Sequence, residues 1–149
     1  MADPLPQLQP RGPIIMLLCH PDSAQRVVNM KFVTIDGDDI GQKITSAYLT
    51  NNAKELVRVN DLVQEKTQSI AYFLKSQGFE ILFCAADGVA GSICSEFDKN
   101  IIFSQIKKIA EQEISFSVGV GTTLREAYIA LLSAKSSGKG RLHDFSDME

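Results

Sequence analysis

The chain has 149 residues, of which 44% are hydrophobic and 22% charged, and its formal net charge is −3. This length suits one domain with a core of its own, and the charge gives no global attraction to nucleic acid or to an anionic membrane. Three cysteines without a CxxC pair argue against a disulfide framework and favour a reducing cytoplasm.

Residues 1–29 are predicted to be a flexible N-terminal extension of a domain that spans residues 30–149. The extension is rich in proline up to about residue 21, and no helical or strand period runs through it. Its apolar stretch at residues 13–18 is far too short to cross a bilayer. The stretch also lacks the basic start and the cleavage site of a signal peptide, so we expect a cytoplasmic protein with no membrane partner.

The domain shows a regular succession of hydrophobic patterns, which predict the order β-α-α-β-β-α-β-α. The predicted elements cover residues 31–36, 40–49, 53–77, 79–85, 89–93, about 95–112, 114–120 and 124–136. The stretch Thr50-Asn51-Asn52 ends the first helix and can cap the long second helix, for which Gly78 is a candidate C-cap. Thr123 and Glu126 match a capping box at the start of the last helix.

This order predicts an α+β, ferredoxin-like fold. Right-handed crossovers give an antiparallel four-stranded sheet of order 4-1-3-2, with helices mainly on one face. The first strand then lies beside the third and antiparallel to it. Asp36 ends the first strand and Asp87 lies in the turn that opens the third. We therefore expect these two carboxylates to meet at one edge of the sheet.

Acidic residues cluster after the first strand, where Asp36, Asp38 and Asp39 lie within four positions. Carboxylates this close repel one another unless a cation or solvent offsets their charge. Oxygen ligands suit a hard cation such as Mg²⁺ or Mn²⁺, whereas the two histidines of the chain lie near its ends and give little support for zinc. A solvated acidic turn is the alternative, and the expected arrival of Asp87 at the same edge favours the metal.

Three blocks of sequence resemble the minimal CRISPR polymerase (mCpol) family, which belongs with GGDEF diguanylate cyclases, class III adenylyl cyclases and CRISPR polymerase palms. The blocks are FVTIDGDDIG at residues 32–41, ILFCAADG at 81–88, and SFSVG at 115–119 continuing to AKSSGKGR at 134–141. The resemblance implies a palm domain that joins nucleoside triphosphates into a cyclic di- or oligonucleotide and releases pyrophosphate. It also implies ATP as the favoured substrate and a signal in anti-phage defence that a downstream effector recognises.

The resemblance also assigns roles by position. Asp36 and Asp87 would be catalytic. The implied ligands of two Mg²⁺ or Mn²⁺ ions per site are Asp36, the backbone carbonyl of Gly37 and Asp87, with Asp38 and Asp39 as further candidates. The candidate nucleotide-binding residues are Asp38, Ile40, Gly41, Lys43, Ala86, Gly88, Lys135, Lys139 and Arg141. For the last three, an ordinary basic helix end that complements the helix dipole is the alternative. Lys43 is a candidate from its place after the acidic turn, and a solvated helix face is its alternative.

Two adjacent positions depart from the family pattern. Relatives usually carry two glycines before the acid of the hairpin, and this chain has Ala85 and Ala86. Glycines there let a nucleotide approach the backbone closely, so a non-catalytic nucleotide-binding or sensing module stays an alternative, as does a nucleotide hydrolase on the same fold. A palm of this size is expected to hold one triphosphate, which predicts a homodimer with facing sites. We expect no direct binding to nucleic acid.

Overall fold

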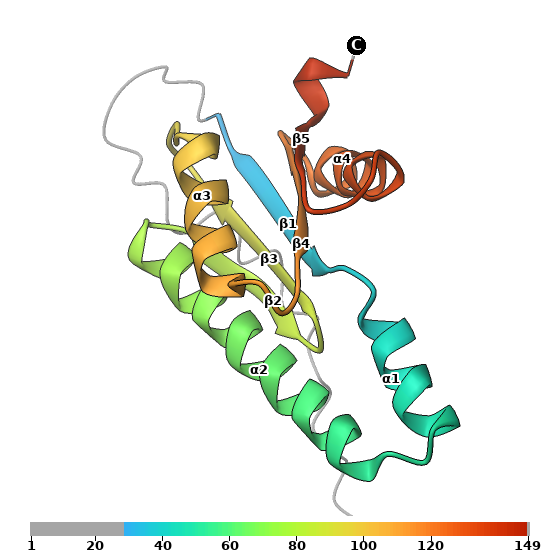
Figure 1. Cartoon of the computed structure of the whole chain (residues 1–149). Helices are drawn as coiled ribbons and strands as arrows, with labels where there is room; N and C mark the ends of the chain where they lie inside the picture. Colours follow the sequence, from blue (N-terminus) through green and yellow to red (C-terminus); the bar gives the residue numbers. More distant parts are fainter. Residues whose placement is uncertain (1–28, 149) are drawn as a thin grey trace, which may run out of the picture.

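The computed structural model describes residues 29–148, and Figure 1 shows their arrangement. All eight predicted elements are present, most of them within two residues of their expected bounds, followed by a short strand and a 3₁₀ helix. The elements are β1 (Lys31–Gly37), α1 (Ile40–Leu49), α2 (Ala53–Ser76), β2 (Glu80–Ala85), β3 (Gly88–Ile93), α3 (Lys99–Ala110), β4 (Phe116–Gly121), α4 (Leu124–Ser136), β5 (Leu142–Asp144) and the 3₁₀ helix Phe145–Asp147.

The sheet has the order β2-β3-β1-β4-β5. Its first four strands are antiparallel and confirm the predicted order, because β1 pairs with both β3 and β4. The fifth strand was not predicted, and it adds to the free edge of β4 in parallel. The fold is therefore an α+β palm with a mixed five-stranded sheet.

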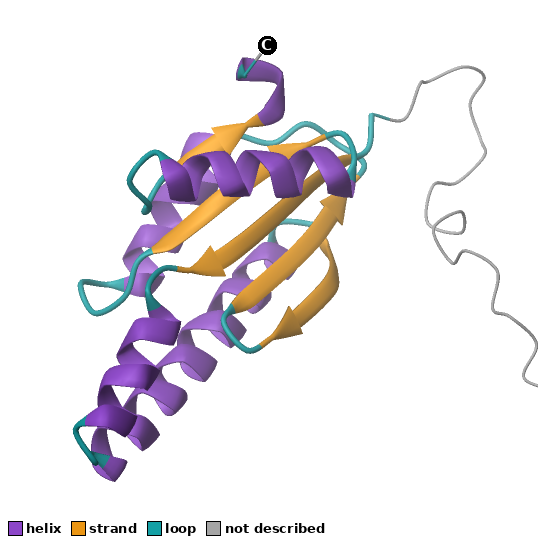
Figure 2. Cartoon of the chain, turned by 90° about the vertical axis from the view of Figure 1, so that its right-hand side faces the viewer, coloured by secondary structure: helices purple, strands orange, loops and turns teal. Residues whose placement is uncertain are grey.

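Helices α2 and α3 cover one face of the sheet, and α4 lies on the other (Figures 1 and 2). The larger core lies between the sheet and α2 with α3, and its fully buried members include Val33, Ile35, Val118 and Ile70. Most of the helical cover is thus on one face, as expected. Because α4 covers β4 and β1, all six residues of β4 are buried.

Local hydrogen bonds fix the ends of the long helix. The Asn52 side chain accepts from the Glu55 N–H at 3.0 Å and caps α2, as the sequence predicts. At the other end Gly78 has a φ of 93°, a left-handed conformation that glycine adopts without strain. The N–H groups of Gly78 and Phe79 bond back to the carbonyls of Lys75 and Leu74, which completes a Schellman motif.

Among the described residues, no helix has the length and apolar character needed to cross a membrane. Residues 1–28 of the predicted extension lie outside the described part, so the boundary at residue 30 stays a prediction.

Candidate active site

The structure brings Asp36 and Asp87 to the same edge of the sheet. Asp36 lies opposite Gly88 in the β1–β3 register, and the Gly37 N–H donates to the Asp87 carbonyl at 2.9 Å. A side chain at Gly37 would have no room, because its Cβ would lie 2.8 Å from Ile40 Cγ1 and 3.2 Å from Asp87 Cβ. Glycine at this position therefore lets the hairpin turn close against the end of β1.

The Lys135 side chain reaches this edge from α4. Its Nζ lies 2.8 Å from Asp36 Oδ2, 3.0 Å from the Gly37 carbonyl oxygen and 3.3 Å from Asp38 Oδ1. Burial alone lowers the pKa of Lys135, but the hydrogen bond and charge of Asp36, with help from Asp38, outweigh it and raise the pKa. The ammonium is therefore held as a cation among the oxygens that the sequence predicts as metal ligands.

For the Asp87 carboxyl, burial and neighbouring charge both act against the ionised form. Partial burial raises its pKa, and the nearby charge of Asp36 raises it further. Two carboxylates that repel each other in a partly buried place are stabilised by a bound cation. The arrangement thus favours cation binding at this edge.

Asp38 is only 3% exposed, and its side chain is buried in the protein. Its oxygens accept hydrogen bonds from Ser115 Oγ at 2.7 Å, Ser117 Oγ at 2.8 Å and the Gly140 N–H at 2.9 Å. Burial raises the pKa of Asp38, but these hydrogen bonds and the charge of Lys135 outweigh it and hold the pKa below its usual value. Because both oxygens are engaged, the geometry favours a bracing role for Asp38, and its predicted metal role remains a prediction.

The two serines that bind Asp38 were not among the predicted site residues. Ser115 precedes β4 and Ser117 lies within it, so the two positions face the same side as alternate residues of an extended chain. Serines at alternate positions, on a strand predicted to pair with the strand that ends in Asp-x-Asp, are a sequence pattern that indicates hydrogen-bond donors for an aspartate.

Asp39 precedes α1 in a left-handed conformation, with a φ of 60°, and its side chain makes no capping hydrogen bond. It pairs instead with Lys139. The first-turn N–H groups of α1, at Ile40 and Gly41, are left without a side-chain cap. An uncapped helix N-terminus with a lysine beside it suits a phosphate group.

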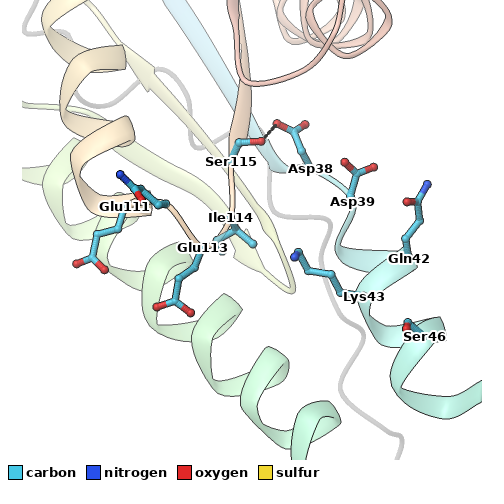
Figure 3. A pocket seen from close by; sticks show the side chains of 10 residues that line it. Asp38, Asp39, Gln42, Lys43, Ser46, Glu111, Glu113, Ile114 and Ser115 are labelled. Carbon is cyan, nitrogen blue, oxygen red and sulfur yellow. Dashed lines mark hydrogen bonds between the residues drawn. The ribbon is translucent and has the colours of Figure 1, made fainter. Parts of the chain in front are cut away.

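Three cavities surround these residues. The largest, about 520 Å³, lies between α1 and the loop before β4, and Figure 3 shows Lys43 pointing across it from α1. The second, about 340 Å³, lies between α1 and α2 and reaches Ala86 and Asp87. The third, about 300 Å³, lies beside α4 and reaches Gly88 and Lys135. Arg141 lines none of the three.

The donor set at the sheet edge is made of oxygen atoms, from two carboxylates and one backbone carbonyl. Within residues 29–148 no three histidine, cysteine or acidic side chains are grouped as a metal site. A divalent metal would therefore depend on Asp36, Asp87 and the Gly37 carbonyl, together with oxygens of the bound substrate. Such a set fits Mg²⁺ or Mn²⁺, which commonly bind through one or two carboxylates plus substrate phosphates.

Comparison with known families decides the relationship. The model of the minimal CRISPR polymerase domain, mCpol, matches residues 32–145. The chain belongs to the mCpol family. All three sequence blocks that resemble the family lie within this match. The matched region also covers nearly all of the described residues, 29–148.

Solved structures place the mCpol fold beside GGDEF domains. The GGDEF domain of Caulobacter crescentus DgcB, in complex with c-di-GMP, has a TM-score of 0.56 and 12% identity over 78% of this chain and 75% of its own. The active GGEEF domain of a Vibrio cholerae diguanylate cyclase has a TM-score of 0.55 and 14% identity over 78% of this chain and 82% of its own. At this identity the likeness shows a shared fold. A search of curated proteins found no match.

Proposed function

We propose that this mCpol domain is a metal-dependent nucleotidyltransferase that joins nucleoside triphosphates, with ATP favoured, into a cyclic di- or oligonucleotide. The observation that carries the proposal is the meeting of Asp36 and Asp87 beside the Gly37 carbonyl, with Lys135 at the same edge. The family's description as a polymerase and the cyclase and c-di-GMP names of its structural neighbours support the same chemistry.

In the proposed reaction a ribose hydroxyl oxygen of one nucleotide forms a bond to the α-phosphorus of another. The bond between the α-phosphorus and the bridging oxygen breaks, pyrophosphate leaves with the electron pair, and the hydroxyl proton passes to solvent. Bound Mg²⁺ or Mn²⁺, two per site, would supply charge neutralisation and activate the hydroxyl. Asp36, Asp87 and the Gly37 carbonyl would hold the metals.

The chain's own groups then position the triphosphate. Backbone N–H groups of Ile40 and Gly41 at the start of α1 are directed to bind phosphate oxygens. Lys139, which pairs with Asp39 just before α1, and Lys135, which contacts Asp36, add positive charge at the same edge. In phosphoryl transfer most of the catalysis is positioning and charge stabilisation, so these groups suffice without a protein nucleophile.

The cavity between α1 and α2 is a suitable place for the base of the nucleotide. Its walls are apolar, from Ile44, Val59 and Val63 among others, and Asn60 and Gln64 bring side-chain amides. An amide offers one donor and one acceptor side by side, the pattern that pairs with adenine. Guanine also presents an acceptor and a donor side by side, at O6 and N1–H, so this lining suits either purine, and the preference for ATP rests on the family resemblance.

The expected homodimer and the defence role are proposals of the same kind. Two copies with facing sites would bring two nucleotides together about a two-fold axis. Molar mass measured by light scattering, with and without nucleotide and Mg²⁺, tests the dimer. Discovery of a cyclic product would justify a search for the effector that binds it.

The decisive experiment incubates the purified chain with each nucleoside triphosphate, singly and mixed, in the presence of Mg²⁺ or Mn²⁺. Mass spectrometry is expected to find a phosphatase-resistant cyclic nucleotide. The Asp36→Asn and Asp87→Asn variants are expected to lose it while keeping the fold. Each removes a charge without changing the size of the side chain, so full turnover in either variant contradicts the proposal.

A nucleotide-binding module without catalysis is the second candidate. It is favoured by Lys135, whose ammonium already neutralises Asp36, and by Ala86 where relatives usually carry glycine. This candidate predicts saturable nucleotide binding, by calorimetry, with no release of pyrophosphate under any metal condition.

A further inference from the structure

A groove on the other face of the sheet also opens at Asp36. It lies between α4 and the β2–β3 hairpin, has a volume of about 300 Å³, and includes Asp36 and Lys135 in its lining. The cavity between α1 and α2 reaches Asp87 from the opposite face. The two carboxylates are therefore flanked by one cavity on each face of the sheet, of about 340 and 300 Å³.

Two aromatic side chains line this α4 groove, and both are more than half exposed. Phe83 from β2 is 54% exposed and Tyr128 from α4 is 56% exposed. Large apolar side chains left in contact with water beside a polar site are typical of binding surfaces. Aromatic rings are also the groups on which nucleobases stack, with little dependence on the identity of the base.

Gly88 keeps the path from the aromatic rings to Asp36 open. A Cβ at this position would lie 3.3 Å from Phe83 Cε1 and 3.6 Å from Asp36 Oδ1. A larger side chain would thus fill the space between the ring and the carboxylate. The small residue leaves room for a group that touches both.

We propose that the α4 groove binds the nucleoside of the second nucleotide, with its base against Phe83 and Tyr128 and its ribose toward Asp36. The inference rests on the proposed function, which requires two nucleotides at this edge. The volume lies at the lower end of the range for small-molecule sites, about 300–1,000 Å³. The groove would hold the second nucleotide on the same chain, so this inference replaces the expectation that each palm holds one triphosphate and that a facing copy supplies the other.

The three tyrosines of the chain allow a binding test that does not depend on turnover. Protein labelled with 3-fluorotyrosine gives ¹⁹F signals from Tyr48, Tyr72 and Tyr128, and the Tyr128→Phe variant assigns the third. Titration uses AMP, GMP, CMP and UMP without divalent metal. The Tyr128 signal is expected to shift in a saturable way with at least one of them, while those of Tyr48 on α1 and Tyr72 on α2 stay in place.

In the Phe83→Ala variant, the mononucleotide concentration that gives half of the Tyr128 shift is expected to rise at least fivefold. An unmoved Tyr128 signal at millimolar mononucleotide overturns the inference, as does an equal shift of all three signals. A Tyr128 signal that moves with protein concentration alone, without nucleotide, assigns the groove to a second copy and also overturns it. Circular dichroism checks that each variant remains folded.

Steady-state kinetics separate this inference from the proposed function. Phe83→Ala and Tyr128→Ala are expected to raise the KM for nucleotide about five- to tenfold, and Tyr72→Ala, an exposed tyrosine far along α2, is the matched control. If wild type releases pyrophosphate and all three variants have the KM of wild type, the proposed role of the groove is wrong and the proposed function stands. If wild type releases none but the Tyr128 signal shifts, the function fails and the groove stands as a nucleoside site.

Discussion

At the scale of single residues, the position of Lys135 would couple the proposed metal binding to nucleotide binding. Its ammonium lies within 3.3 Å of three oxygens, which belong to the predicted metal ligands Asp36 and Gly37 and to the further candidate Asp38. A divalent cation and an ammonium about 4 Å apart repel each other by roughly 2–8 kcal/mol when the effective dielectric constant is between 80 and 20. A triphosphate that draws Lys135 away from Asp36 would therefore make room for the metal.

Lys135→Met keeps the length of the side chain and removes its charge. We expect the nucleotide-free variant to bind Mn²⁺ about tenfold more tightly than wild type, which corresponds to about 1.4 kcal/mol. Electron paramagnetic resonance of free Mn²⁺ measures the affinity. Turnover should fall in the same variant, because a phosphate contact is lost. The double variant with Asp36→Asn should lose the gain, and equal Mn²⁺ affinity in wild type and Lys135→Met would show that the lysine does not compete with the metal.

Ala86 carries backbone strain that its replacement would relieve. Its φ is 50°, in the left-handed region, where a residue with a Cβ is less stable than glycine by roughly 1 kcal/mol. We expect Ala86→Gly to raise the free energy of unfolding by about 0.5–1 kcal/mol, measured by urea denaturation. The matched control is Ala85→Gly at the end of β2, which should lower it by about 0.5–1 kcal/mol because glycine weakens a strand. Equal changes in both variants would rule out strain at Ala86.

At the scale of elements, the ion pairs of Lys99 connect α3 to β5 and to the 3₁₀ helix that follows it. Lys99 is the first residue of α3, and its Nζ lies 3.0 Å from Asp144 of β5 and 2.7 Å from Asp147 of the 3₁₀ helix. A cation at a helix N-terminus opposes the helix dipole. The two carboxylates offset this cost, and they hold β5 against β4 next to the loop that carries Lys139 and Gly140.

Lys99→Met should loosen β5 without unfolding the sheet. Because the pairs are partly exposed, we expect a loss of about 0.5–1 kcal/mol in global stability. Amide hydrogen exchange should show the larger effect, with faster exchange at residues 142–147 and unchanged exchange in β1 and β3. Lys107→Met is the control, since Lys107 lies on the same helix at its other end. Uniformly faster exchange across the sheet would contradict a local role.

The ion pairs of Lys99 with Asp144 and Asp147 should weaken in acid. Burial raises the pKa of Asp144, but hydrogen bonds from Lys99 and Ser146 outweigh it and leave the pKa below its usual value. A carboxyl with a lowered folded pKa contributes stability above its unfolded pKa, about 3.9, and this contribution is lost as the pH falls through the folded value. The protection factors of residues 142–147, which correct for the slower intrinsic exchange in acid, should therefore fall below about pH 4 in wild type, and the fall should be smaller in Lys99→Met.

At the scale of the whole molecule, the sequence predicts what depends on local periodicity and strand order. The eight elements and the meeting of Asp36 and Asp87 follow from hydrophobic spacing and from the antiparallel pairing of β1 with β3. Strand β5 is three residues long, too short for a period, and its parallel pairing depends on a distant edge. The burial of Asp38 depends on serines 77 and 79 residues away, so their alternation becomes informative only once the pairing of β1 with β4 is known.

The packing of α4 on β4 joins the fold to the site, because α4 carries Lys135. A Cβ at Gly119 would lie 2.9 Å from Leu131 Cα and closer still to the Ala127 carbonyl oxygen, so the helix could not keep its place. Gly119→Ala should therefore lower the free energy of unfolding by about 3 kcal/mol or more, since overpacking against backbone cannot relax by rotamer changes. Gly41→Ala is the control, because a Cβ there meets nothing within 4 Å and alanine favours a helix by about 1 kcal/mol. Urea denaturation measures both variants. If Gly119→Ala were as stable as wild type, α4 would not rest on β4 as the structure has it, and the approach of Lys135 to Asp36 would lose its structural basis.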